Sequence, residues 1–244
     1  MDYNQYNNQP NGQYGYGQPA PQVALADYVS QIMKRVYLRM ALALVVTAFA
    51  AYFTLVSGLF NYIFQSPTPM FVLMIAEVGL VLFLSARIDK MSDTTSTILF
   101  FLYSILNGVT LSLLFVVYTM SSIAQTFFIT AGVFGAMTIY GYTTSRDLTK
   151  IGTYLVMALI GLIVCVVVNI FLKSSTFDFI ISLAGVAIFI GLTAWDTQKI
   201  KGWAAATVDQ PEMVGRLATM GALSLYLDFV NLFIYLLRIF GRRN

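Results

Sequence analysis

The chain contains no histidine, and this absence removes several kinds of chemistry. Among its 244 residues there is also only one cysteine, Cys165. Without histidine, Ser-His and Cys-His nucleophilic mechanisms and His-bound metals are excluded, so a response to pH near neutrality has to come from carboxylates or other groups in unusual surroundings. One cysteine excludes an internal disulfide and a cysteine cluster for zinc or iron–sulfur chemistry. We expect no cofactor.

Charged residues are scarce and apolar residues abundant. Charged residues make up 10% of the chain, against about 25% in soluble domains. Apolar residues make up 58%, against about 45–50%. The net charge is +3, but the basic residues gather at the ends of apolar runs, where they set topology rather than bind nucleic acid. The composition predicts an all-α integral membrane protein whose main surroundings are the lipid bilayer.

Seven apolar segments are each close to the ~20 residues that cross a bilayer. Pro67 and Pro69 predict a turn over Asn61–Pro69, and a long loop is expected over Thr197–Gly215. A re-entrant last segment with six full spans is the alternative to seven spans. The expected spans are Leu38–Phe60, Met70–Ile88, Thr97–Met120, Ile123–Tyr142, Gly152–Leu172, Phe177–Trp195 and Leu217–Phe240.

The segment before the first span differs from the rest. Residues 1–25 consist mainly of Asn, Gln, Tyr, Gly and Pro, and they carry too little apolar surface to offset chain entropy. We expect a disordered cytoplasmic tail, either solubilising or used for docking, followed by one membrane domain over residues 26–244. The tail lacks the pattern of a signal peptide.

Lys and Arg residues predict the orientation. With the amino terminus inside, ten of them lie on the cytoplasmic side and four on the far side, so the positive-inside rule favours a cytoplasmic amino terminus. The ten are Lys34, Arg35, Arg39, Arg87, Lys90, Arg146, Lys150, Lys199, Lys201 and Arg216; the four are Lys173, Arg238, Arg242 and Arg243.

Two spans carry polar and small residues at steps of three and four, which places them on one face of a helix. An ionised carboxylate inside a membrane is costly and commonly functional. If the two faces meet, Asp196 and Asp228 can share one proton, although a helical ruler of ~1.5 Å per residue places them at different depths. Alternatively, each carboxylate is capped separately. The faces comprise Ser182, Gly185, Phe189, Thr193 and Asp196, and Gly221, Ser224, Asp228, Asn231, Tyr235 and Arg238.

Other polar and small residues have alternative interpretations. Arg87 is either a cation that changes partner when the aspartate pair loses its proton or an anchor at the membrane interface. Glu77 is expected in the outer half of the membrane, where it could attract a cation. Stripes that include Gly108, Gly135 and Gly161 predict close helix packing.

Several motifs resemble the BAX inhibitor-1 family of membrane proteins. They are TAWDTQKIK at 193–201 and GALSLYLDFVNLFIYLLRIFG at 221–241, with GYTTSRDLTKIGTYLVMALIGLIV at 141–164 and NGVTLSLLF at 107–115 resembling its bacterial branch. The resemblance implies six helices around a central seventh, a bacterial inner-membrane location and a pH-sensitive calcium leak. It further implies a hydrogen-bonded pair of Asp196 and Asp228 that Arg87 can contact, with Glu77 in a matching position.

Three functional hypotheses follow. The first is a calcium leak controlled by protons, in which Asp196 and Asp228 bind calcium transiently and Ser224, Asn231 and Glu77 lie along the ion pathway. The second is a non-conducting scaffold or a regulator of membrane proteases or cell-death factors, which would bind other membrane proteins. An intramembrane aspartyl protease is disfavoured, because those enzymes carry glycine two residues before the second aspartate; we therefore expect no enzymatic activity.

Overall fold

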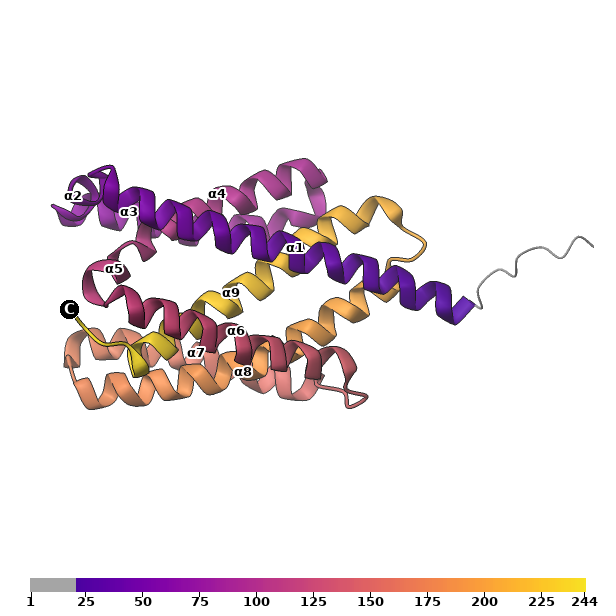
Figure 1. Cartoon of the computed structure of the whole chain (residues 1–244). Helices are drawn as coiled ribbons and strands as arrows, with labels where there is room; N and C mark the ends of the chain where they lie inside the picture. Colours follow the sequence, from indigo (N-terminus) through magenta and orange to yellow (C-terminus); the bar gives the residue numbers. More distant parts are fainter. Residues whose placement is uncertain (1–20) are drawn as a thin grey trace, which may run out of the picture.

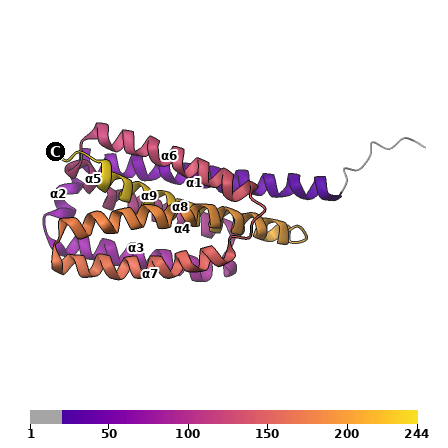
Figure 2. The same ribbon diagram turned by 90° about the horizontal axis from the view of Figure 1, so that it is seen from below.

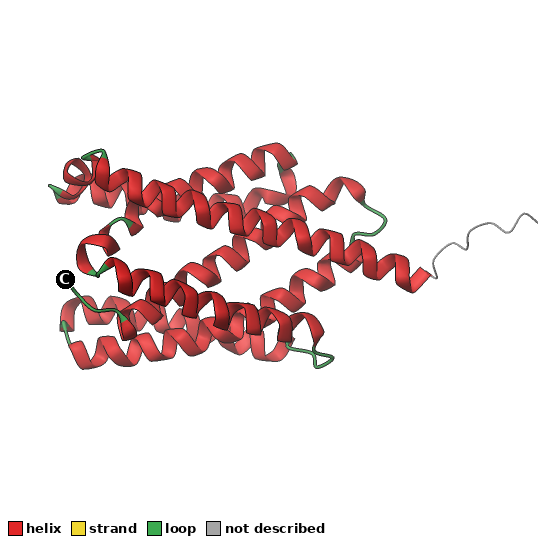
Figure 3. Cartoon of the chain, viewed as in Figure 1, coloured by secondary structure: helices red, strands yellow, loops and turns green. Residues whose placement is uncertain are grey.

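A computed structural model describes residues 21–244, and within this range the chain is helical without β-strands (Figures 1 and 3). Seven helical segments are long and apolar enough to cross a membrane, as predicted. The helices are α1 (Pro21–Val56), α2 (Leu59–Phe64), α3 (Pro67–Arg87), η1 (Ile88–Lys90), α4 (Asp93–Leu111), α5 (Leu113–Val117), α6 (Met120–Thr143), α7 (Thr149–Leu172), α8 (Ser175–Ala206), η2 (Pro211–Met213) and α9 (Val214–Phe240).

The last helix, α9, is the most buried of the seven spans. In its apolar segment 67% of the residues are buried, against 6% in α3 and in α7. It packs against α1, α4, α6 and α8, whereas α3 packs mainly on α4 and α7 on α8. Four of the other six spans are thus direct neighbours of α9, and the expected arrangement of six helices around a central seventh stays a prediction. Because α9 runs the length of the bundle, the carboxyl terminus lies at the end opposite to the first turns of α1 (Figures 1 and 2).

The outer helices present apolar side chains on the surface. Phe171 on α7 is 81% exposed, and Ile75 on α3 is 70% exposed. In water such surfaces would be costly, but a lipid bilayer solvates them. The surface thus fits a chain embedded in a membrane.

Helix ends follow the local sequence. Ser92 and Thr119 accept hydrogen bonds from backbone amides in the first turns of α4 and α6, which satisfies groups that a helix start leaves without partners. Gly58 takes a left-handed conformation with φ of 76° and separates α1 from α2, a geometry that glycine adopts without steric cost. The expected turn over Asn61–Pro69 is wrong in part, because Asn61–Phe64 belong to α2.

Two other boundaries differ from the sequence predictions. Helix α8 does not end at Trp195 but continues to Ala206, so the expected loop over Thr197–Gly215 is wrong in its first half. Ile200 and Ala204 in this extension are completely buried, and their packing stabilises a helix whose polar residues suggested a loop. At the other end of the chain, residues 1–20 lie outside the described range. Residues 21–25, also expected in the tail, open α1.

Close packing between helices depends on particular glycines. A Cβ atom at Gly141 on α6 would lie 2.2 Å from the backbone oxygen of Ala194 on α8, and one at Gly108 on α4 would lie 2.4 Å from the backbone oxygen of Thr47 on α1. The prediction for Gly108 is confirmed. The predictions for Gly135 and Gly161 are wrong, because a Cβ atom there would meet nothing within 4 Å.

The last four residues tie the end of α9 to the segment between α5 and α6. The amide of Thr119 donates to the carbonyl of Arg242, and the amide of Asn244 donates to the carbonyl of Val117, both at 3.0 Å. The side-chain amide of Asn244 adds a hydrogen bond of 3.0 Å to the carbonyl of Val116. These bonds fix the end of the most buried helix against two helices that precede it by more than a hundred residues.

Candidate functional site

A cavity of about 460 Å³ lies between α7, α8 and α9. Both aspartates of the predicted pair line it, Asp196 from α8 and Asp228 from α9. Helix α7 contributes apolar side chains to the opposite wall. The arrangement therefore places two acidic groups in one hollow within the membrane-spanning part of the protein.

The extension of α8 and the early start of α9 explain how the two aspartates reach one cavity. Asp196 lies about 15 Å along α8 from Ala206, and Asp228 lies about 21 Å along α9 from Val214. The two helices run in opposite directions and join at this end. Asp196 and Asp228 are therefore offset by ~6 Å along the helix axes. This offset is smaller than the one expected if the helices ended at Trp195 and began at Leu217.

Asp196 already has a partner. Its side chain is buried, and its Oδ1 atom accepts a hydrogen bond of 2.5 Å from the Nζ atom of Lys199. The same Nζ atom lies 4.2 Å from the ring centre of Trp195 and 5.0 Å from that of Trp203. Lys199 thus forms an ion pair on one side and cation–π contacts with two indole rings.

The surroundings of Asp228 differ from those of Asp196. It is 4% exposed, and its Oδ2 atom is buried without a hydrogen-bond partner among the described residues. It lines the same cavity as Asp196 and Lys199. No hydrogen bond joins the two aspartates within residues 21–244. A buried carboxylate oxygen without a partner is costly, so this atom is available to a proton, a water molecule or a cation.

The polar face predicted on the last span borders the cavity. Ser224, Asn231 and Tyr235 line it together with Asp228. The side-chain amide of Asn231 donates to the carbonyl of Leu227 at 2.8 Å, and its oxygen can act as an acceptor. Towards the carboxyl end of α9, Arg238 pairs with Asp178 at 3.4 Å and lies over the ring of Tyr235. An ion pair therefore lies beyond the cavity, towards the carboxyl end of α9.

Arg87 lies elsewhere. It is exposed at the end of α3 and does not line the cavity. Within the described residues it forms no ion pair at 4 Å or less. Its predicted contact with the aspartates is not formed in this conformation, and the role of a switch stays a prediction.

Glu77 belongs to a second polar cluster, between α3 and α4. Its carboxylate accepts a hydrogen bond from the hydroxyl of Thr110. Nearby, the hydroxyl of Tyr226 on α9 donates to Asn107 at 3.1 Å and lies 2.7 Å from that of Thr47 on α1. Sequence reasoning missed this cluster, although the position of Tyr226, two residues before Asp228, indicates a different helix face. Glu77 does not line the cavity of the two aspartates.

A stable metal site is not formed by these groups. Within the described residues, no three Asp, Glu or Cys side chains come together in a geometry that could hold a metal ion. Calcium takes about 6–8 oxygen ligands, more than two carboxylates supply. A calcium ion in this cavity would also need the hydroxyl of Ser224, the amide oxygen of Asn231 and water.

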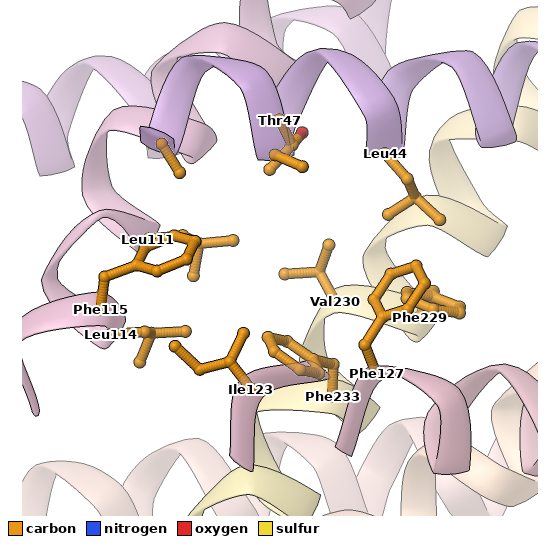
Figure 4. A pocket seen from close by; sticks show the side chains of 12 residues that line it. Leu44, Thr47, Leu111, Leu114, Phe115, Ile123, Phe127, Phe229, Val230 and Phe233 are labelled. Carbon is orange, nitrogen blue, oxygen red and sulfur yellow. The ribbon is translucent and has the colours of Figure 1, made fainter. Parts of the chain in front are cut away.

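A second cavity, of about 100 Å³, lies between α1, α4, α5, α6 and α9 (Figure 4). Its walls are apolar apart from Thr47. The hydroxyl of Thr47 already bonds with Tyr226. Since this cavity offers no charged side chain, the two aspartates define the better candidate for a site that binds ions.

Comparison with known proteins places residues 29–244, which include all of the helices except the start of α1, in one group. A family model described as "Inhibitor of apoptosis-promoting Bax1" matches residues 29–244. The chain is 46% identical over 227 residues to a protein of Escherichia coli named "Inner membrane protein YbhL", covering 92% of this chain and 95% of that protein. It is 47% identical over 213 residues to an uncharacterized protein of Rickettsia prowazekii, covering 87% and 89%.

Proposed function

The chain belongs to the Bax inhibitor-1 family of membrane proteins, which confirms the resemblance in its sequence, and on this basis we propose that it is a pH-sensitive calcium leak. The observation that carries the proposal is the cavity that Asp196 and Asp228 line together, where one carboxylate oxygen of Asp228 is buried without a partner among the described residues. Intramembrane carboxylates commonly mark ion or proton pathways.

The charge of the cavity depends on its protons. If one aspartate is protonated, it can donate a hydrogen bond to the other and hold α8 and α9 together. If both are ionised, they repel each other and attract a cation. Calcium would bind transiently, because too few protein oxygens are present for a tight site. Arg87 would serve as a cation that approaches the pair after a movement of α3, and Glu77 as a further acidic group on the pathway.

The positive-inside rule supports a cytoplasmic amino terminus, and the relative from Escherichia coli is named an inner membrane protein. Calcium would then pass between the cytoplasm and the far side of that membrane. We propose no enzymatic reaction. Where an intramembrane aspartyl protease needs glycine before its second aspartate, this chain has Tyr226, whose side chain is completely buried and hydrogen-bonded.

Calcium flux into liposomes that contain the purified protein tests the proposal. We expect the wild-type protein to conduct calcium with a rate that changes from acid to alkaline pH. Asp196→Asn and Asp228→Asn should each remove most of this pH dependence. Asp147→Asn is the control, because this carboxylate lies in the exposed loop between α6 and α7. Unchanged flux and pH response in both cavity variants would overturn the gating role.

The family description favours a second candidate function, namely regulation of other membrane proteins without conduction. The partners would be membrane proteases or cell-death factors, and the segment 1–25 would contribute to their binding. Deleting this segment tests the idea. If the shortened protein no longer captures a partner while its calcium flux is unchanged, the tail has a binding role. Absence of calcium flux in every preparation of folded protein would favour this function over the leak.

A further inference from the structure

We propose that Lys199 is an internal cation that occupies the aspartate cavity and competes with metal ions for Asp196. In this view its ammonium group holds the place of a cation when the site is empty, and it has to move before calcium binds there. This inference rests on the proposed function, because it assigns to one residue the control of cation binding at the same site.

The helical spacing around Lys199 positions its ammonium group. Trp195 precedes it by four residues and Trp203 follows it by four, so both indoles lie on the same side of α8 as the lysine. Asp196 precedes it by three residues and receives its hydrogen bond at 2.5 Å. The surroundings of one ammonium group thus consist of an acidic group at the cavity wall and two aromatic rings.

The ammonium group is also partly removed from water. The side chain of Lys199 is 25% exposed, and that of Asp196 is 11% exposed. Aromatic faces attract a cation more strongly where water is excluded. The four-carbon stem of lysine is flexible, which allows the ammonium group to leave the carboxylate and approach Trp203 without losing all its contacts.

Calcium and the ammonium group cannot both occupy this part of the cavity at low cost. A calcium ion bound to Asp196 at the usual ~2.3–2.6 Å would lie next to a positive charge that is itself 2.5 Å from the same carboxylate. Besides this pair, the residues that line the cavity include two ionisable side chains, Asp228 and Tyr235, and both belong to α9. The lysine therefore lowers the affinity for calcium for as long as it stays on Asp196.

Lys201 provides a matched control on the same helix. Its Nζ atom donates to the carbonyl of Tyr142 at 2.8 Å and lies 4.9 Å from the ring of Tyr142. Like Lys199, it combines a hydrogen bond with a cation–π contact, but its acceptor is a neutral backbone carbonyl instead of a carboxylate. Because Lys201 does not line the cavity, removing its charge should change neither cation binding nor flux through the aspartate site.

Terbium luminescence in detergent measures the binding directly. Terbium(III) substitutes for calcium and is excited by a nearby indole, and the two tryptophans of the chain are those that flank Lys199. In Lys199→Gln we expect the concentrations of terbium and of competing calcium at half-saturation to fall roughly tenfold. Lys199→Arg keeps the charge and should remain close to wild type, as should Lys201→Gln.

Calcium flux in liposomes gives the second measurement. The calcium concentration at half-maximal flux should fall in Lys199→Gln and stay unchanged in Lys201→Gln. Lys199→Met serves as a second neutral variant if the glutamine variant does not fold. Unchanged or weaker binding in the neutral variants, or an equal effect in Lys201→Gln, would overturn the proposal.

The two measurements separate this inference from the proposed leak. Tighter terbium binding in Lys199→Gln, with no flux in any variant, would leave the role of Lys199 intact and remove the leak. Flux that depends on Asp228 but not on the charge of residue 199, together with unchanged terbium binding, would keep the leak and remove the role of Lys199.

Discussion

Replacing Gly141 with alanine should weaken the contact between α6 and α8, and Gly135 on the same helix provides a matched control. At position 141 the new Cβ atom would lie 2.2 Å from the backbone oxygen of Ala194 and 2.9 Å from its carbonyl carbon. Backbone atoms cannot rotate away as a side chain can. The two helices would have to separate by roughly 1 Å to restore ordinary contact distances. At position 135 a Cβ atom meets nothing within 4 Å.

The expected changes in the free energy of unfolding differ in sign. Overpacking at Gly141 costs about 1–3 kcal/mol, whereas replacing glycine by alanine inside a helix gains about 0.5–1 kcal/mol. Gly141→Ala should therefore lower the free energy of unfolding by up to about 2 kcal/mol, and Gly135→Ala should raise it by up to about 1 kcal/mol. The two variants carry the same chemical change on the same helix, so their difference isolates the contact with Ala194.

Reversible unfolding in mixed detergent micelles, followed by tryptophan fluorescence, measures this difference. Ala194 precedes Asp196 by two residues, so calcium flux in liposomes should also change in Gly141→Ala and not in Gly135→Ala. Equal stability of the two variants within about 0.5 kcal/mol, the usual range for changes without a specific contact, would refute the assignment of a tight contact at Gly141.

Three further variants test local features. Ser92→Ala removes the side chain that accepts from the amide of Thr95, and it should lower the free energy of unfolding in micelles by about 1 kcal/mol. Deletion of Asn244 removes its bonds to the carbonyls before α6 and should cost about 1 kcal/mol in the same assay; no change would refute the anchoring role. Hydrogen bonds from Thr149 lower the pKa of Asp147 below its ordinary value of 3.8, so this carboxylate stabilises the folded state above that pH and the effect is lost as pH falls through the lower folded-state pKa. Asp147→Ala should accordingly reduce the melting temperature at neutral pH, and the difference from wild type should shrink in strong acid.

The seven spans could be predicted because a bilayer requires long apolar segments, but their ends could not. Hydropathy drops where Gln198, Lys199 and Lys201 follow Trp195, and the sequence therefore suggested a loop. The helix continues because Ile200 and Ala204 are buried against neighbouring helices, a contact between distant segments that composition does not reveal.

Small-residue stripes have the same limitation. Spacing identifies a face of a helix, but it does not identify the face that meets a neighbour. Gly108 was predicted at a packing surface and lies there, while Gly135 was predicted and is open. Gly141, six residues further along α6 and on a different face of the helix, makes the close contact with α8.

The meeting of Asp196 and Asp228 in one cavity could be anticipated from their two polar faces, but the partner of Asp196 could not. Lys199 was assigned to the basic residues that set orientation, because a lysine near the end of a span normally has that role. The spacing of Trp195, Asp196, Lys199 and Trp203 was present in the sequence. Its meaning required the longer α8, which keeps all four residues on one continuous helix.

The position of α9 in the chain has a consequence for biosynthesis. This helix is the most buried of the seven spans in residues 21–244, yet it is synthesised after the other six. Until it arrives, the hydroxyl of Thr47 lacks its hydrogen bond to Tyr226, and the cavity that Asp196 lines lacks the wall that α9 supplies. Arg242 and Asn244, which follow α9, then bond to the segment before α6. The cavity of the two aspartates, which α9 helps to line, can therefore be completed only after the other six spans have been made, and we expect a chain cut short before α9 to leave it open on that side.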